Sequence, residues 1–135
     1  LQRAARRRGK YYFFTSALGF GALIVIFSPQ GQTLEEFDNI PPNIDLETVN
    51  SINVPLEKVI PVMPSYAPPD IKQILESIYK GASPPPSLSI GVGLASLLAT
   101  NEALNILLRR REISDAPYYT YVDLMDRKFI VGKSV

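Results

Sequence analysis

Residues Pro86–Val131 read PSLSIGVGLASLLATNEALNILLRRREISDAPYYTYVDLMDRKFIV, and this stretch decides the fold. Its first half predicts one long helix, from about Ser87 to Arg109, with apolar residues around nearly its whole circumference. Such a helix is too apolar to lie on a surface, so we expect it to be wrapped by other structure. The second half alternates around Tyr118–Asp123 and Arg127–Val131, which predicts a closing β-hairpin whose tyrosines supply part of that wrapping.

Polar residues inside this helix favour a core helix over a membrane span. Asn101, Glu102 and Asn105 interrupt the apolar run. Glu102 is the one carboxylate that the helix constrains, and two interpretations are open for it. It is either a buried partner of a basic residue or part of a polar stripe with the two asparagines, and we favour the stripe.

Composition limits the chemistry that the chain can carry. It has 135 residues, 46% hydrophobic and 20% charged, which is typical of at most one globular domain or a piece of a larger one. It has no cysteine and no histidine, which excludes disulfides, thiolate nucleophiles, Cys/His zinc sites and imidazole acid–base catalysis. Because it starts at Leu1 inside an apparent helix, we interpret it as the C-terminal portion of a longer protein.

The N-terminal ten residues hold five of the fourteen basic side chains. Residues 1–9 predict the last turns of a helix that ends at Gly9. A basic run before an apolar segment raises nucleic-acid and membrane interpretations. We favour a solvated helix face, and we expect neither a nucleic acid nor a membrane as a partner.

The apolar segment Tyr11–Phe27 has two interpretations. It has no charge and follows a basic run, as a single membrane anchor would. However, its two ends are rich in aromatic and β-branched residues, and Gly19 and Gly21 between them suit a turn. We therefore expect a strand, a glycine turn and a second strand, with the membrane anchor as the alternative.

The chain divides into three parts: 1–29 with the helix end and strand pair, 30–86, and 87–135 with the core helix and terminal hairpin. The middle part is broken by prolines and predicts a long irregular crossover with a short helix around Leu34–Phe37. Two interpretations of this segment are equally open: it is a lid or binding loop, or it merely packs over the sheet. Near 70–80, apolar residues at helical spacing predict a short amphipathic helix.

No complete catalytic constellation is present. The glycines of Gly19-Phe20-Gly21 precede an apolar strand, whereas a phosphate loop opens a helix. The acidic residues Glu35, Glu36 and Asp38 are of the type that binds cations, but three acids in a loop are more often solvated. We predict no catalytic residue and no metal site on this chain.

The order of these segments resembles the C-terminal half of the ThiF/MoeB/HesA family of ubiquitin-activating-enzyme-like adenylyltransferases. YYFFTSALGFGALIVIFSP resembles the family's strand pair after its metal-binding aspartate. The late helix matches at Ala99, Thr100, Glu102 and Ala103, and YYTYVDLMDRKFIV resembles the terminal strands, including Asp123. The crossover matches only in position and character.

The resemblance implies the C-terminal portion of a Rossmann-like, ThiF-type α/β domain: a mixed sheet, an apolar core helix and a terminal β-hairpin. The parent enzyme would use ATP and Mg²⁺ to adenylate the C-terminal carboxylate of a ubiquitin-like or sulfur-carrier protein. The family's nucleotide and metal residues would lie before Leu1, so this chain alone would bind no cofactor and be structural and inactive. The thioester cysteine of many relatives is absent, as are their paired zinc-binding cysteines.

The resemblance also implies where partners lie. Thr15, Ser16 and Ala17 would border the channel for the acceptor's tail, and the crossover would cover that tail. The missing N-terminal half of the domain is the first expected partner, with a homodimer as a further one, in the cytoplasm.

Overall fold

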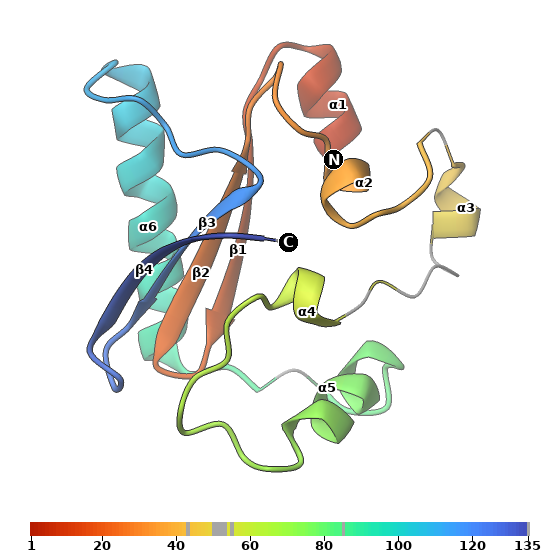
Figure 1. Cartoon of the computed structure of the whole chain (residues 1–135), viewed down its shortest axis with the longest axis vertical. Helices are drawn as coiled ribbons and strands as arrows, with labels where there is room; N and C mark the ends of the chain where they lie inside the picture. The colour runs from red at the N-terminus through yellow and green to blue at the C-terminus, as the bar shows by residue number, and fades with distance from the viewer. Residues whose placement is uncertain (43, 50–53, 55, 85, 135) are drawn as a thin grey trace.

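The computed structural model describes residues 1–42, 44–49, 54, 56–84 and 86–134. They form a mixed α/β fold in which four strands make one antiparallel sheet in the order β1-β2-β3-β4 (Figure 1). The elements in chain order are α1 (Gln2–Arg7), β1 (Tyr12–Leu18), β2 (Gly21–Phe27), α2 (Leu34–Phe37), α3 (Leu46–Val49), α4 (Leu56–Val59), α5 (Ile71–Tyr79), α6 (Ser89–Leu107), β3 (Tyr118–Asp123) and β4 (Lys128–Lys133).

The predicted hairpin at the N-terminal end is confirmed. β1 and β2 pair antiparallel from Tyr12 opposite Phe27 to Leu18 opposite Gly21. Gly19 in the turn has φ of +61°, a conformation that glycine adopts without the steric cost of a side chain. A single helix over this segment, as the membrane-anchor alternative required, is therefore wrong. All seven residues of β2 are buried, because this central strand is covered on both faces.

The crossover contains two helices that the sequence predicts and two that it does not. α2 lies at the expected Leu34–Phe37 and begins with a capping box, in which Thr33 and Glu36 bond each other's backbone N–H groups. α5 lies within the predicted 70–80 range, whereas the short helices α3 and α4 were not predicted. Residues 43, 50–53, 55 and 85 of the predicted crossover lie outside the described residues.

α6 returns along the sheet and packs on β1 and β2. It begins close to the β1–β2 turn, where Gly91 approaches that turn's backbone: a Cβ atom at Gly91 would lie 2.5 Å from the carbonyl oxygen of Gly19. The closing hairpin is confirmed, with β3 paired to both β2 and β4. Its second strand begins at Lys128 and reaches Lys133, two residues beyond the predicted end.

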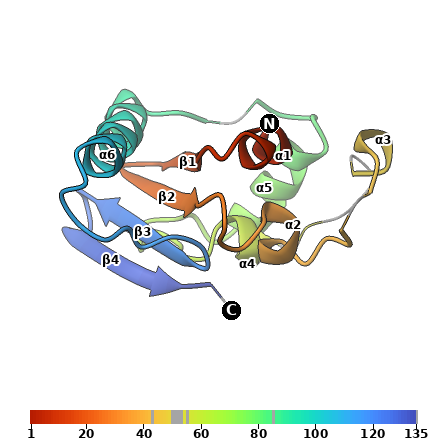
Figure 2. The same cartoon turned by 90° about the horizontal axis from the view of Figure 1, so that it is seen from above.

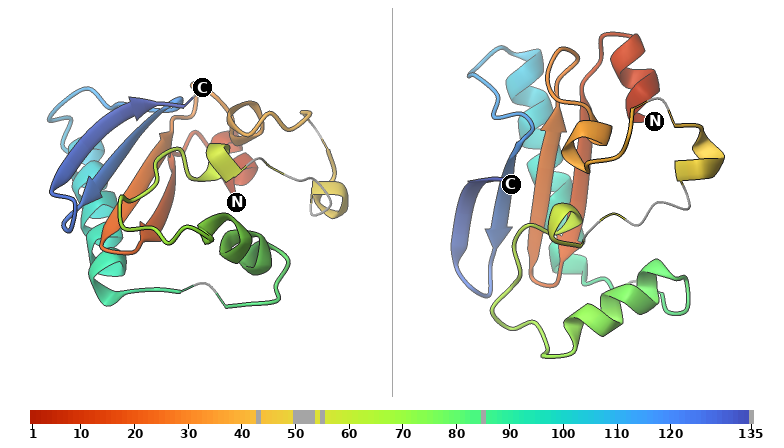
Figure 3. Two further views of the ribbon diagram at one scale, coloured as in Figure 1. Left: turned by 60° about the horizontal axis from the view of Figure 1, so that its bottom comes forward. Right: turned by 45° about the vertical axis from the view of Figure 1, so that its right-hand side comes forward.

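The two faces of the sheet pack against different elements. Successive strand residues point to opposite faces, so Ala17 and Ile26 lie on the face that α6 covers. On the other face, Val25 and Phe27 form the buried core with Phe37 of α2, and the Phe27 and Phe37 rings meet edge to face at 5.5 Å. Figures 2 and 3 show α6 on one side of the sheet, with α2, α4 and α5 on the other.

The expectation that α6 is wrapped on every side is wrong for the described residues. Its buried residues are Gly91, Glu102 and Asn105, while Leu97 is 68% exposed. The hairpin borders α6 on one side, where Phe129 and Val131 line a cavity with Leu98 of the helix. Its tyrosines Tyr119 and Tyr121 lie on the opposite face of the sheet. Apolar residues around a whole helix show that it has partners, but not where those partners lie.

α6 is also the one described helix that is long and apolar enough to cross a membrane. This rests on length and composition alone, and the core helix of a soluble protein meets the same criterion.

Candidate functional site

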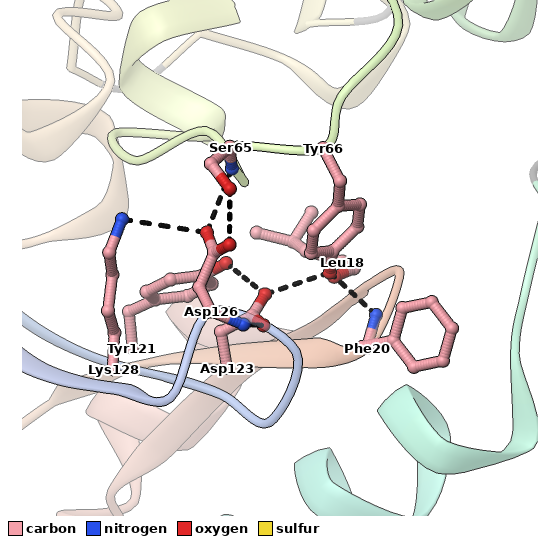
Figure 4. Close-up of polar contacts among 8 residues, drawn as sticks. All are labelled: Leu18, Phe20, Ser65, Tyr66, Tyr121, Asp123, Asp126 and Lys128. Carbon is pink, nitrogen blue, oxygen red and sulfur yellow. Dashed lines mark hydrogen bonds and ion pairs between the residues drawn. The ribbon is translucent and has the colours of Figure 1, made fainter.

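A polar cluster lies where the β1–β2 turn meets the β3–β4 turn. A segment of the crossover, Ser65 and Tyr66, lies across these two turns (Figure 4). We call the cluster the turn network; its side chains are those of Ser65, Tyr66, Tyr121, Asp123 and Asp126. It brings together three segments that are more than forty residues apart along the sequence.

Asp123 is the centre of the turn network. It ends β3 and is only 1% exposed. Its Oδ2 accepts hydrogen bonds from the hydroxyls of Tyr66 at 2.8 Å and Tyr121 at 2.6 Å, and its Oδ1 accepts the backbone N–H of Asp126 at 2.8 Å. Burial alone would raise the pKa of this carboxyl, but these three donors outweigh burial and lower it. Asp123 is therefore a buried, fully bonded carboxylate.

Tyr66 connects Asp123 to the other turn. Its hydroxyl accepts the backbone N–H of Phe20 at 2.8 Å and lies 3.2 Å from the carbonyl oxygen of Leu18. Its ring stands edge-on to the Phe20 ring, with centroids 5.6 Å apart. Burial and the neighbouring Asp123 raise the pKa of Tyr66 to about 12, so the hydroxyl remains protonated and donates.

Asp126 provides a second anchor for the crossover. Its Oδ2 accepts the backbone N–H of Ser65 at 2.8 Å, and its Oδ1 accepts the Ser65 hydroxyl. The ammonium group of Lys128 lies 3.5 Å from the same Oδ2. The Ser65 hydroxyl and N–H lower the pKa of Asp126, which is ionised at neutral pH.

The hydrogen bonds of the turn network attach the crossover to the sheet, and they indicate a structural role. Both Asp123 oxygens already accept hydrogen bonds, and its tyrosines are donors with raised pKa values, so neither residue type is prepared to take a proton or attack a substrate. The network instead holds the crossover against the turn end of the sheet at one point.

A second polar site lies between α6 and the β3–β4 hairpin. Glu102 is 7% exposed, and its Oε1 accepts from the guanidinium of Arg111 and from the Asn101 amide, the latter at 3.2 Å. Its Oε2 is buried without a hydrogen-bond partner among the described residues. Our preferred interpretation, a polar stripe, is therefore wrong: Glu102 is the buried partner of a basic residue. A cavity of about 210 Å³ adjoins it.

The three predicted channel residues do not form a cluster. In β1, Thr15 is exposed, Ser16 and Ala17 are partly buried, and alternate residues face opposite sides of the sheet. Ala17 lies beneath α6, close to Gly91. Within the described part of the chain, β1 has β2 as its one neighbour, so Thr15–Ala17 lie on an edge strand just before the Gly19 turn.

The N-terminal basic run is more than a solvated face. The guanidinium of Arg3 pairs with Glu35 and donates to the carbonyl of Ile44 at 2.6 Å, and Arg6 donates to the carbonyl of Gly31 at 2.7 Å. These bonds join α1 to the start of the crossover.

The three acidic residues that we considered for a cation, Glu35, Glu36 and Asp38, have separate surroundings in the structure. Glu35 pairs with Arg3, and Glu36 closes the α2 capping box. Asp38 is partly buried, and burial raises its pKa to about 6. Among the described residues no group of three or more carboxylate side chains is placed to hold a metal ion.

Sequence reasoning found one residue of the turn network and missed the rest. Asp123 was noted only through the family resemblance. Tyr66 was not noted; the available signal was a tyrosine within the proline-rich run Pro64-Ser65-Tyr66, since a buried tyrosine hydroxyl usually has a hydrogen-bond partner.

Comparison with known protein families, with curated proteins and with solved structures gives no match.

Proposed function

We propose that this chain is the C-terminal part of an ATP-dependent adenylyltransferase of the ThiF/MoeB/HesA type. In this proposal the enzyme activates the C-terminal carboxylate of a ubiquitin-like or sulfur-carrier protein in the cytoplasm, and residues 1–135 are its structural portion. The observation that carries the proposal is that β1, which follows α1, is an edge strand in the described part of the sheet.

The position of α1 before β1 is compatible with a further strand beside this edge. In a β-α-β unit a parallel strand precedes the helix and the helix leads into the second strand, which is the order that a strand before α1 would give to α1 and β1. A strand before α1 would extend the sheet beside β1 and turn the four antiparallel strands into the end of a larger mixed sheet. A Rossmann-like domain of this kind is what the family resemblance implies.

The described residues do not fit ATP or Mg²⁺. The paired glycines at Gly19 and Gly21 lie in a tight hairpin followed by a strand, so no helix N-terminus receives phosphates there. The described carboxylates form no metal-binding group. The nucleotide would therefore be bound by the preceding half of the domain, with this chain supplying the sheet floor.

The acceptor tail would pass near the end of β1. Thr15–Ala17 lie close to the Gly19 turn, and the turn network holds the crossover at Ser65 and Tyr66 beside the same turn. An extended peptide that reached this end of the sheet would thus be bordered by β1 and covered by the crossover.

ATP–pyrophosphate exchange tests this proposal. We expect the full polypeptide encoded by the source gene to exchange pyrophosphate in the presence of a small carrier protein that ends in Gly-Gly. We expect purified 1–135 to be inactive, and the same carrier with an amidated C-terminus to support no exchange. Exchange by 1–135 alone would overturn the structural role, and a full polypeptide without exchange on any such carrier would overturn the enzyme.

A further inference from the structure

β4 is an edge strand of the described sheet, at the opposite end from β1. β3 is its one neighbour within the described part of the chain, and Figure 2 shows no other segment along its outer side. The strand pairs with β3 residue for residue, without a bulge, and it contains no proline and no charge between its terminal lysines. Bulges, prolines and central charges are the usual protection of an exposed edge, so this edge is a template for a further strand.

The pairing of β3 with β4 determines which backbone groups of β4 point outward. The N–H of Ser134 donates to the carbonyl oxygen of Pro117 at 2.9 Å, and these two residues continue the register of the strands. In an antiparallel pair, residue pairs that exchange hydrogen bonds alternate with pairs that do not. Counting back along β4 from Ser134, every second residue therefore bonds to β3, and the N–H and C=O groups of the others point away from it. The outward-pointing groups are those of Phe129, Val131 and Lys133.

The side chains of the same three residues lie together on the α6 side of the sheet, because alternate strand residues share a face. Phe129 is 71% exposed and Val131 is 53% exposed. The Lys133 ammonium lies 6.0 Å from the centre of the Tyr118 ring on β3. The edge therefore offers exposed apolar side chains at the residues whose backbone groups point outward, and cross-strand pairs of such side chains stabilise a sheet.

A second copy of β4 matches this edge in one register better than in any other. In an antiparallel pair across a two-fold axis, outward-pointing residues must face outward-pointing residues, so the registers that overlap most of the strand are centred on Ile130 or on Val131. The register centred on Ile130 places Lys133 opposite Arg127, which carries a like charge and lies in the turn with φ of +52°. The register centred on Val131 places Lys133 opposite Phe129, so all three outward residues exchange backbone hydrogen bonds.

We propose that two copies of this chain pair through β4 across a two-fold axis at Val131, which joins their two four-stranded sheets into one. The two Val131 side chains face each other as a β-branched cross-strand pair, and Lys128 faces Ser134, so no like charges are opposed. The same surface is used on both copies, so the contact closes at a dimer. The proposal does not rest on the function proposed above, because a strand before α1 would lie beside β1 at the other edge.

Single cysteines test the register, because the chain has no cysteine of its own. Opposite residues that exchange hydrogen bonds have Cα atoms about 5.5 Å apart, which a disulfide spans. Under mild oxidation of the intact chain, Val131→Cys should form disulfide-linked dimers at least about tenfold faster than Leu124→Cys, a similarly exposed position in the β3–β4 turn. Phe129→Cys and Lys133→Cys should each link poorly to themselves, since the two copies of either residue would lie about 13 Å apart. A mixture of these two variants should link readily.

Val131→Pro tests the backbone hydrogen bonds between the two copies. Because the N–H of Val131 points away from β3, proline removes the central donor of the contact and leaves the β3–β4 bonds in place. In sedimentation velocity from about micromolar to about millimolar chain, we expect the native chain to dimerise reversibly and the proline variant to have a dissociation constant at least about tenfold higher. Val131→Thr keeps the N–H and the β-branch, so it should dimerise like the native chain. Circular dichroism checks that each variant folds.

Three results would overturn the proposal. The first is a native chain that remains monomeric at about millimolar concentration, where even weak contacts are detected. The second is a dimer that a folded Val131→Pro variant leaves unchanged. The third is disulfide formation by Val131→Cys that is no faster than by Leu124→Cys, or that is slower than by Ile130→Cys, which would show a different pairing. If the proline variant does not fold, the cysteine pattern decides between the proposal and its rejection.

Discussion

At the scale of single residues, buried carboxylates dominate the electrostatics of this molecule, and each has its own balance of burial against hydrogen bonding. Asp123 is buried with three donors, which keep it charged. Asp38 is partly buried, and burial raises its pKa to about 6. Glu102 has donors on one oxygen only. Because burial and bonding pull a pKa in opposite directions, Asp123 and Asp38 give opposite responses to pH.

Asp123→Asn removes the charge of the turn network while keeping its shape. We expect the free energy of unfolding at pH 7 to fall by about 2 kcal/mol, because charge-assisted hydrogen bonds from Tyr66 and Tyr121 become weaker neutral ones. The folded pKa of Asp123 is lowered, so its contribution is present above the ordinary value of 3.8 and is lost as the pH falls below it. Urea unfolding from pH 7 to pH 3 should show wild type and variant converging at low pH. A constant difference would contradict this.

Asp38 should respond in the reverse direction. Its folded pKa of about 6 exceeds the ordinary 3.8, so the folded state holds the proton more tightly, and stability falls as the pH rises through this window. Asp38→Asn abolishes that loss. We expect the variant to be more stable than wild type by about 1 kcal/mol at pH 7, allowing for solvent screening, with little difference at pH 3.5. Thermal unfolding at the two pH values measures it, and a variant less stable at pH 7 would show that the charge of Lys58 outweighs burial at Asp38.

At the scale of elements, α6 depends on its close approach to the β1–β2 turn. Gly91→Ala would place a Cβ atom 2.5 Å from the carbonyl oxygen of Gly19 and 2.9 Å from that of Gly21, and backbone atoms cannot move aside easily. Gly93 in the same helical turn has open space around it. The two positions therefore share a helix propensity and differ in packing.

Substituting alanine at Gly91 and at Gly93 should change the free energy of unfolding in opposite directions. Gly93→Ala should stabilise the fold by up to about 1 kcal/mol, which is the helix propensity of alanine over glycine. Gly91→Ala should destabilise it by about 2 kcal/mol, because overpacking exceeds the same gain in propensity. Urea denaturation compares both with wild type. Stabilisation by both substitutions would mean that α6 does not rest on the turn at Gly91.

The helices and strands were easier to predict from the sequence than the contacts that they make with one another. The β1–β2 hairpin followed from Gly19 and Gly21, and α5 from its apolar stripe, because these signals are local. The face of α6 that packs on the sheet could not be predicted, because apolar residues around the whole helix do not distinguish a buried face from an exposed one. The Glu102–Arg111 pair joins a helix to a loop nine residues later, where no periodicity applies.

At the scale of the whole molecule, the crossover is held at two places, at its start by α1 and near its middle by the turns of the sheet. Arg3 and Arg6 hold its first part to α1, while the turn network holds Ser65 and Tyr66 near its middle. The Tyr66–Asp123 bond spans 57 residues, so sequence patterns carry no information about it, and tertiary folding alone brings the two together. The sheet and α6 also have contacts of their own, between neighbouring strands and between α6 and β1 and β2.

Tyr66→Phe should therefore separate crossover order from global stability. The substitution removes the hydroxyl that bonds Asp123 and Phe20 but keeps the ring, so we expect limited proteolysis within 56–70 to be about tenfold faster. The urea midpoint should fall only slightly, because β1–β4 and α6 keep their contacts. Tyr11→Phe, which changes an exposed tyrosine just before β1, is the matched control and should cleave like wild type. If proteolysis of the Tyr66 variant instead rises in step with global unfolding, the crossover and the sheet are one cooperative unit, and the turn network stabilises the whole fold.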